Sequence, residues 1–150
     1  MSPVRNLIPI GSLVLGIIFA LVLHSNFPLQ TVIEYPWTLL GIPLIVFGLL
    51  QFTLSVSHFV RHKTDIRPSG KPTTLIVNGP FRYTRNPIYL ANMIVLLGVC
   101  LLLGSVASFI VIPLYFVIVN SFIVPFEEAM LVTVFSEQYN EYTKRVRRWL

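Results

Sequence analysis

Four long stretches of this 150-residue chain contain no Asp, Glu, Lys or Arg. They cover residues 7–23, 37–60, 87–103 and 106–126. A helix needs roughly 17–25 apolar residues to cross a bilayer, so each stretch is long enough to span one. None of them alternates polar with apolar residues as a membrane β-barrel strand does. The sequence therefore predicts an all-α integral membrane bundle of four transmembrane helices, folded as a single domain over residues 1–150.

The composition excludes a water-soluble monomer. The chain is 55% hydrophobic and 11% charged, whereas ordinary globular chains carry about 25% charged residues. That leaves too little polar surface to cover a protein of this size in water. The single cysteine, Cys100, excludes an internal disulfide, and with only three histidines the chain cannot form a Cys/His zinc cage. We therefore expect no bound metal.

All 11 Lys and Arg residues fall on one side of a four-span arrangement. One precedes the first span, six lie between the second and third spans, and four follow the fourth, while the other two connections contain none. The positive-inside rule then predicts that both termini and the loop between the second and third spans are cytoplasmic. Because the basic residues flank spans, the net charge of +5 indicates contact with membrane lipids and not with nucleic acid.

Two segments outside the spans are expected to carry structure of their own. The loop at residues 64–86 contains several Pro and Gly residues, too many for one helix, and is unusually long for an idle connection. Residues 127–148 place apolar side chains every three or four positions against a polar face. This spacing predicts a C-terminal amphipathic helix that lies on the membrane or over the loop.

The pair Asn86-Pro87 predicts the start of the third span. Asn is expected to cap the helix with its side chain, and Pro suits the first helical position. The free amides of that turn, together with Arg82 and Arg85 just before it, could hold a carboxylate or a phosphate. The alternative is that the two arginines only follow the positive-inside rule and contact lipid headgroups.

Glu127 and Glu128 follow directly after the last apolar stretch. A carboxylate pair at this position is costly to bury and calls for a cationic partner, which could be Arg82, Arg85 or a charged ligand. Asn120 lies seven residues before Glu127 and is expected on the same helical face. Alternatively, the acidic pair only complements the dipole of the C-terminal helix.

A stripe of polar residues follows the second span through Gln51, Ser55, His58 and His62. Such stripes most often form hydrogen bonds between helices, although a substrate-facing wall or a base is also possible. His58 and His62 are four residues apart, but no third ligand lies nearby, which disfavours a metal site. Cys100 is expected to be a small packing residue, because it has no positive neighbour to stabilise a thiolate.

The second half of the chain contains two motifs, at residues 71–90 and 125–150, and together they resemble the isoprenylcysteine carboxyl methyltransferase family. Residues 71–90 (KPTTLIVNGPFRYTRNPIYL) are similar to the signature loop of that family. Residues 125–128 (PFEE) resemble its paired glutamates, residues 135–139 (FSEQY) resemble the segment that follows, and residues 142–150 resemble its closing run.

The resemblance implies a membrane enzyme that transfers methyl groups from S-adenosylmethionine, close to the short bacterial members and related to phospholipid methyltransferases. It implies a bacterial inner-membrane type of location, with loop 64–86 and the C-terminal helix enclosing the cofactor at the cytoplasmic face. The partners would be membrane lipids and a small or lipophilic acceptor. By motif, the cofactor-binding positions are Thr73, Thr74, Leu75, Ile76, Phe81, Arg85, Asn86, Pro87, Ile88, Tyr89 and Glu127. The candidates for assisting proton loss from the acceptor are Tyr89, His58 and His62.

The chain departs from the eukaryotic members of that family at two positions. Asn86 stands where they have histidine, and Ile123 stands where they have an arginine that approaches the substrate carboxylate. A buried anion without a cationic partner is heavily penalised, so we do not expect a prenylcysteine carboxylate as acceptor. Two other functions stay open, namely an NADPH-dependent membrane reductase of related fold and a non-catalytic membrane subunit or lipid-binding scaffold.

Overall fold

The computed structural model describes residues 8–27, 31–61 and 74–150. Over these residues the chain is helical, apart from turns, extended connections and one isolated bridge between Thr31 and Ser105. Its elements, in chain order, are α1 (Ile8–Asn26), η2 (Trp37–Leu40), α2 (Gly41–Arg61), η3 (Gly79–Arg82), α3 (Pro87–Leu103), α4 (Val106–Phe109), α5 (Val111–Ile118), the π-helical turn η4 (Val119–Ile123) and α6 (Val124–Arg145).

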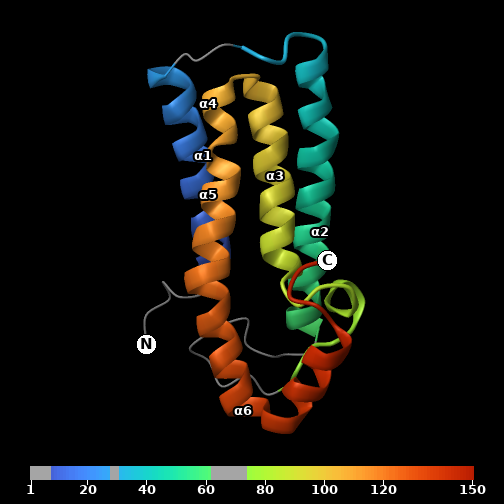
Figure 1. The fold of residues 1–150 in the computed structure, drawn as a ribbon. Coiled ribbons are helices and arrows are strands. Elements are labelled where there is room, and N and C mark those ends of the chain that lie inside the picture. The colour runs from blue at the N-terminus through green and yellow to red at the C-terminus, as the bar shows by residue number, and fades with distance from the viewer. Residues whose placement is uncertain (1–7, 28–30, 62–73) are drawn as a thin grey trace.

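The long helices form an up-and-down bundle (Figure 1). Helix α1, helix α2, helix α3 and the column formed by α4 and α5 alternate in direction (Figure 1). Helix α6 extends the last column beyond the bundle and then turns back, so that the C-terminus lies beside the start of α3 (Figure 1). The end of α2, the start of α3 and α6 therefore meet at one end of the molecule.

Three helical segments are long and apolar enough to cross a membrane: Ile8–Asn26, Trp37–Arg61 and Val106–Arg145. The protein is therefore an integral membrane protein. Helix α3 is apolar as well but has 17 residues. The last segment has 40 residues, which corresponds to about 60 Å of helix, against a hydrocarbon core of about 30 Å. Its part without charged residues, as far as Phe126, is long enough for one crossing.

Helices α2 and α3 pack closely because glycine occupies their crossing points. The nearest atom to a Cβ added at Gly41 would be the Gly98 carbonyl oxygen, at 2.3 Å, and a Cβ at Gly48 would lie 2.7 Å from Val95. Small residues that let backbones approach are typical of helix contacts in membranes, where the hydrophobic effect does not drive association. This contact fixes the position of α3, and with it the position of the α3 N-terminus.

The fourth apolar stretch begins with a tight turn and is interrupted once. Gly104 ends α3 in a left-handed conformation (φ 67°), and its N–H donates to the Cys100 carbonyl. The helix then breaks at Ile110, between α4 and α5. Pro113 lies three residues later and has no N–H to offer to the Phe109 carbonyl, which accounts for the break.

Hydrogen bonds between helices come from a buried group that the sequence did not indicate. The Asn92 amide donates to the Pro9 carbonyl (2.8 Å) and to the Tyr115 hydroxyl (2.9 Å), which also lies 3.1 Å from the Ser12 hydroxyl. These contacts join α3 to α1 and α5. Ser55, which we expected to bond to a neighbouring helix, instead donates to the Gln51 carbonyl of its own helix.

The C-terminal helix differs from the predicted range of 127–148. Helix α6 continues from the last span without a break at residue 127, is kinked at Ser136 (φ 40°), and ends at Arg145. Val146 is extended (φ −123°, ψ 128°). The prediction of helix as far as residue 148 is wrong, because residues 147–149 form hydrogen bonds with the start of α3 and with Asn120 in place of helical ones.

Candidate functional site

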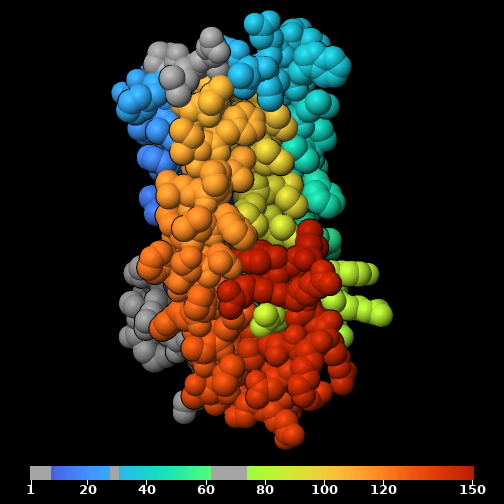
Figure 2. All heavy atoms as spheres, viewed as in Figure 1, coloured from blue at the N-terminus to red at the C-terminus, as the bar shows by residue number. Residues whose placement is uncertain are grey.

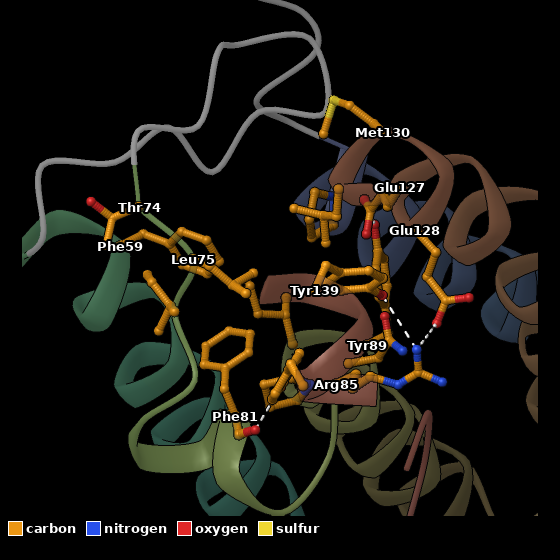
Figure 3. Close-up of a pocket in the computed structure, with 17 residues that line it drawn as sticks. Phe59, Thr74, Leu75, Phe81, Arg85, Tyr89, Glu127, Glu128, Met130 and Tyr139 are labelled. Carbon is orange, nitrogen blue, oxygen red and sulfur yellow. Dashed lines mark hydrogen bonds and ion pairs between the residues drawn. The ribbon is translucent and has the colours of Figure 1, made fainter. Parts of the chain in front are cut away.

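A cavity of about 110 Å³ lies at the end of the bundle where α3 begins and α6 leaves it (Figure 3). One side is formed by residues 74–76 and η3, and another by the first residues of α3. Both halves of α6 close it opposite them. The residues that line it are Pro9, Phe59, Thr74, Leu75, Ile76, Phe81, Arg85, Asn86, Pro87, Ile88, Tyr89, Glu127, Glu128, Met130, Leu131, Tyr139 and Tyr142.

The start of α3 is buried and tied to the C-terminus. The Asn86 side chain does not cap the helix as predicted, since its Nδ2 donates to the Arg148 carbonyl at 3.0 Å. The Thr84 hydroxyl donates to the same carbonyl (3.0 Å) and accepts the Asn86 backbone N–H (3.2 Å). Ile88 and Tyr89 follow Pro87 in the first turn, where backbone N–H groups have no partner within the helix. Oriented donors therefore stand at the cavity.

Glu127 is the first of the two carboxylates at the cavity. Its Oε1 accepts the Tyr89 hydroxyl at 2.6 Å, and Tyr89 itself is only 3% exposed. The pKa of the Glu127 carboxyl is raised to about 7, mainly by burial. The hydrogen bond from Tyr89 lowers this pKa in part, and the nearby charge of Glu128 raises it. In the described part of the chain, its only hydrogen-bond donor is this neutral hydroxyl. Glu127 is thus a partly buried carboxylate whose charge is not balanced.

Glu128, in contrast, is balanced by two arginines. Its carboxylate lies 3.0 Å from Arg85 Nη1. It also accepts hydrogen bonds from Nε (3.2 Å) and Nη2 (2.5 Å) of Arg148. The Arg85 guanidinium also donates to the Tyr139 hydroxyl at 3.3 Å (Figure 3). Of the cationic partners suggested by the sequence, Arg85 is the one that meets the acidic pair, while Arg82 is exposed.

The π-helical turn η4 sets the directions in which the Glu127 and Glu128 side chains point. In a regular α-helix, residues seven apart lie on the same face, because each residue turns the chain by about 100°. A π turn contains one extra residue, so residues eight apart become aligned across it. Asn120 therefore lines up with Glu128, and Arg148 contacts both side chains. The prediction that Asn120 shares a face with Glu127 is wrong for this reason.

Short element η3 is held between α2 and α6. The Phe81 ring packs edge-on against Phe59 (ring centres 5.3 Å apart), and the Phe81 carbonyl accepts the Tyr142 hydroxyl at 2.6 Å. Burial raises the pKa of Tyr142, so the hydroxyl stays protonated and donates. Gly79 begins η3 with φ 63°, and a Cβ there would lie 2.2 Å from the His58 ring. Glycine is required at this position both for its conformation and for the space.

The structure gathers the predicted cofactor residues that it describes around this one cavity. Only Thr73 lies outside the described residues. Of the candidates for proton removal, Tyr89 lines the cavity, His58 packs against Gly79, and His62 lies outside the described residues. Whether any of them binds a cofactor stays a prediction.

Sequence reasoning missed several residues of the cavity. They are Pro9, Phe59, Met130, Leu131, Tyr139 and Tyr142, whereas Glu128 was singled out only as the neighbour of Glu127 in an acidic pair. Tyr139 and Tyr142 stood on the apolar face of the predicted amphipathic helix, and the FSEQY motif includes the first of them. The helix was expected to lie on the membrane or over the loop and to help enclose the cofactor, but its periodicity did not indicate which of its side chains would line the cavity.

A second cavity lies between α1 and the column of α5 and η4. It measures about 300 Å³, and its lining is apolar apart from Ser12 and Tyr115. Ile123 also lines it, and packs in the same hydrophobic cluster as Tyr89, a residue of the first cavity. The two cavities are therefore lined in part by residues of one hydrophobic cluster.

Comparison with known proteins supports the resemblance seen in the motifs. Residues 36–138 match the family model described as phospholipid methyltransferase. The chain is 33% identical over 99 residues to the protein-S-isoprenylcysteine O-methyltransferase of Schizosaccharomyces pombe, a match that covers 66% of this chain and 40% of that protein. It is 28% identical over 107 residues to the cobalt-zinc-cadmium resistance protein CzcN of Cupriavidus metallidurans, covering 71% of this chain and 44% of that protein.

The matched part of the chain thus spans less than half the length of these two relatives. No solved structure matches the chain. The family model covers more than half of the residues, on both sides of the cavity. The chain therefore belongs to the phospholipid methyltransferase family of enzymes, and the resemblance to the isoprenylcysteine carboxyl methyltransferases is confirmed.

Proposed function

We propose that this protein transfers a methyl group from S-adenosylmethionine to a small or lipophilic acceptor at the cytoplasmic face of the membrane. The observation that carries the proposal is the charge balance of the first cavity. Glu128 is neutralised by Arg85 and Arg148, whereas Glu127 has only a neutral donor among the described residues. A cavity with one unbalanced carboxylate favours a ligand of net positive charge. S-adenosylmethionine, with a sulfonium, an ammonium and a carboxylate, is such a ligand.

The residues around the cavity fit the parts of that molecule. Glu127 can accept a hydrogen bond from the ammonium group or from the ribose hydroxyls. Arg85 and the N–H groups of Ile88 and Tyr89 suit the carboxylate, as the start of a helix favours an anion. Phe81, with Leu75 and Ile76, offers apolar surface for the adenine ring. We assign Thr73, Thr74, Asn86 and Pro87 to the same site on the family motif.

When bound, S-adenosylmethionine supplies a methyl group on a positively charged sulfur. The protein then has to align the acceptor with that carbon and exclude water, and both effects are served by a buried site. Tyr89 is the best placed of the three candidates for assisting proton loss, because it lines the cavity and its hydroxyl donates a hydrogen bond to the Glu127 carboxylate at 2.6 Å. A route for the acceptor proton through Tyr89 to Glu127 follows from this contact.

The second cavity is where we place the apolar chain of the acceptor. It lies along the membrane-spanning part of α1 and α5, where the surrounding solvent is lipid. Because its lining is almost wholly apolar, it suits an alkyl or isoprenoid chain and not a charged group. Ile123, in its lining, packs against the hydrophobic cluster that includes Tyr89, which brings such a chain toward the first cavity.

Substitution of Ile123 by arginine tests the class of acceptor. A guanidinium placed in an apolar wall is costly, so Ile123→Arg is expected to reduce methylation of a neutral or amine acceptor at least about tenfold. A carboxylate acceptor would instead gain from the new positive charge. Methylation of both classes should be measured with the wild type and the variant. Strong wild-type methylation of a farnesylcysteine carboxylate would contradict our assignment of the acceptor.

We propose four membrane crossings, with both termini in the cytoplasm. The described Lys and Arg residues all lie at the end of the bundle where α6 is found, whereas the connection between α1 and α2 and the turn after α3 lie at the opposite end (Figure 1). A reporter that is active only outside the cytoplasm is expected to be silent when fused after Leu150 and active when inserted at Gln30. The reverse pattern would contradict the topology.

Binding experiments separate the proposed activity from the alternatives. The purified protein in detergent should bind S-adenosylmethionine in calorimetry, and should transfer labelled methyl groups to a component of a membrane lipid extract. A reductase would instead bind NADPH. The unbalanced negative charge of Glu127 would repel the phosphates of that cofactor, which disfavours this alternative. A folded protein that does not bind S-adenosylmethionine would contradict the proposed function. Binding of NADPH would then indicate the reductase, and binding of neither cofactor would indicate the scaffold.

A further inference from the structure

The C-terminal segment, Val146–Leu150, lies across the start of α3 (Figure 2). Its backbone accepts three hydrogen bonds there. The Arg147 carbonyl accepts the Arg85 N–H at 3.0 Å, and the Arg148 carbonyl accepts the side chains of Thr84 and Asn86, both at 3.0 Å. The segment therefore sets the backbone of residues 84–86, which leads into the first cavity.

The Arg148 side chain makes a second connection to the same cavity. Its guanidinium binds Glu128 through two nitrogens, and the same carboxylate holds Arg85 at 3.0 Å. A two-point contact of this kind fixes orientation as well as charge. The Glu128 and Arg85 side chains are 17% and 16% exposed, so the pairing takes place largely out of water. Arg148 itself does not line the cavity.

Asn120 and Trp149 anchor the segment on its other side. The Asn120 Oδ1 accepts the Trp149 indole N–H at 3.0 Å and lies 3.4 Å from Arg148 Nη1. The Trp149 ring packs against Phe116, with ring centres 5.3 Å apart. Since η4 aligns Asn120 with Glu128, one face of the α5–α6 column carries both contacts for Arg148. The other glutamate, Glu127, is left to face the cavity.

We propose that Arg148 is a positioning residue for the cofactor. Through Glu128 it holds the Arg85 side chain, and through its carbonyl it holds Asn86, so that both stand ready for the amino-acid end of S-adenosylmethionine. The two neighbouring glutamates then have different tasks: Glu128 ties the C-terminal segment to the site, and Glu127 meets the ligand. This inference rests on the proposed function.

Two ligands that cannot donate a methyl group from sulfur test it by binding alone. S-adenosylhomocysteine retains the amino-acid end, whereas 5′-methylthioadenosine retains only the nucleoside and a short thioether. For Arg148→Gln we expect the Kd of S-adenosylhomocysteine to rise about tenfold, because a charged contact behind Arg85 is lost. The Kd of 5′-methylthioadenosine is expected to stay within about twofold, since that ligand lacks the groups that Arg85 meets.

Arg147→Gln is the matched control. Its side chain is exposed and only its carbonyl joins the contact, so both Kd values should stay unchanged. Arg148→Lys keeps the charge but not the two-point geometry, and should give an intermediate rise for S-adenosylhomocysteine even if Arg148→Gln fails to fold. Thermal unfolding of each variant in detergent accompanies the titrations.

Each outcome of these titrations supports or contradicts the proposed role of Arg148. Weaker binding of S-adenosylhomocysteine alone supports positioning, with the partial effect of Arg148→Lys as a second support. An equal loss for both ligands would assign Arg148 to general stability, and no loss for either would remove it from the site. If the wild type binds neither ligand, the proposed function fails together with this inference, whereas a wild type that binds both isolates the role of Arg148.

Discussion

Glu127→Gln is expected to weaken binding of S-adenosylmethionine by roughly ten- to a hundredfold. The substitution preserves shape, and the amide oxygen can still accept the Tyr89 hydroxyl that Glu127 accepts at 2.6 Å. What is lost is the negative charge that the cavity leaves unbalanced, and a hydrogen bond to a charged group is worth about 1.5–3 kcal/mol. Every 1.4 kcal/mol is about tenfold in affinity. Calorimetry of the detergent-solubilised protein measures the effect.

Glu137→Gln is the control for Glu127→Gln, because Glu137 lies on the same helix but is exposed. It removes the same charge from the protein and should leave the affinity unchanged. Unchanged affinity in a folded Glu127→Gln protein would contradict the proposal and assign Glu127 to structure.

The pH dependence of binding gives an independent check on Glu127. Burial raises the pKa of its carboxyl to about 7, so the group loses its proton as the pH rises through that value. The ionised form attracts a cationic ligand, and the wild-type affinity should therefore increase from about pH 6 to about pH 8. The groups that face it are the Tyr89 hydroxyl and the Glu128 carboxylate. Glu127→Gln should lack this part of the pH dependence.

The arrangement of the bundle could be predicted from the sequence because it depends on local properties. Apolar length identifies the membrane-spanning helices, Gly104 marks the end of α3, and Pro113 accounts for the break at Ile110. The end of the C-terminal helix could not be predicted in this way. Its periodicity continues beyond Arg145, but Trp149 is held by Asn120, which lies 29 residues earlier in the chain. A contact between residues so far apart in the chain cannot be recognised from the spacing of apolar residues along a helix.

The part of the candidate site that lies in sequence motifs could be predicted. The part that depends on the helical register of the last column could not. Residues 74–76 and 85–89 and Glu127 come together at one cavity, as expected for neighbours in two motifs. The π turn at η4 shifts the helical register by one residue, and no residue type marks such a turn. For that reason the sequence placed Asn120 with Glu127, although it contacts the partner of Glu128. The same shift separates the two carboxylates into different environments.

Gly98→Ala is expected to destabilise the folded bundle by about 1–3 kcal/mol or more, the usual cost of overpacking a filled core. A Cβ at Gly98 would lie 2.7 Å from the Gly41 carbonyl oxygen and 3.0 Å from the Ile45 backbone nitrogen. Both are main-chain atoms, so relief requires α2 and α3 to move apart. By helix propensity alone, Gly to Ala should stabilise a helix by up to about 1 kcal/mol. Gly11→Ala measures that baseline, since a Cβ there meets nothing within 4 Å.

Thermal unfolding in detergent should therefore change in opposite directions for the two substitutions. Gly98→Ala should lower the midpoint, and Gly11→Ala should leave it unchanged or raise it. The effect should extend to the site, because the α2–α3 contact also sets where α3 begins, and Phe59 at the end of α2 packs on Phe81. A Gly98→Ala protein with the midpoint and cofactor affinity of the wild type would show that the two helices tolerate separation, and that the cavity does not depend on their close approach.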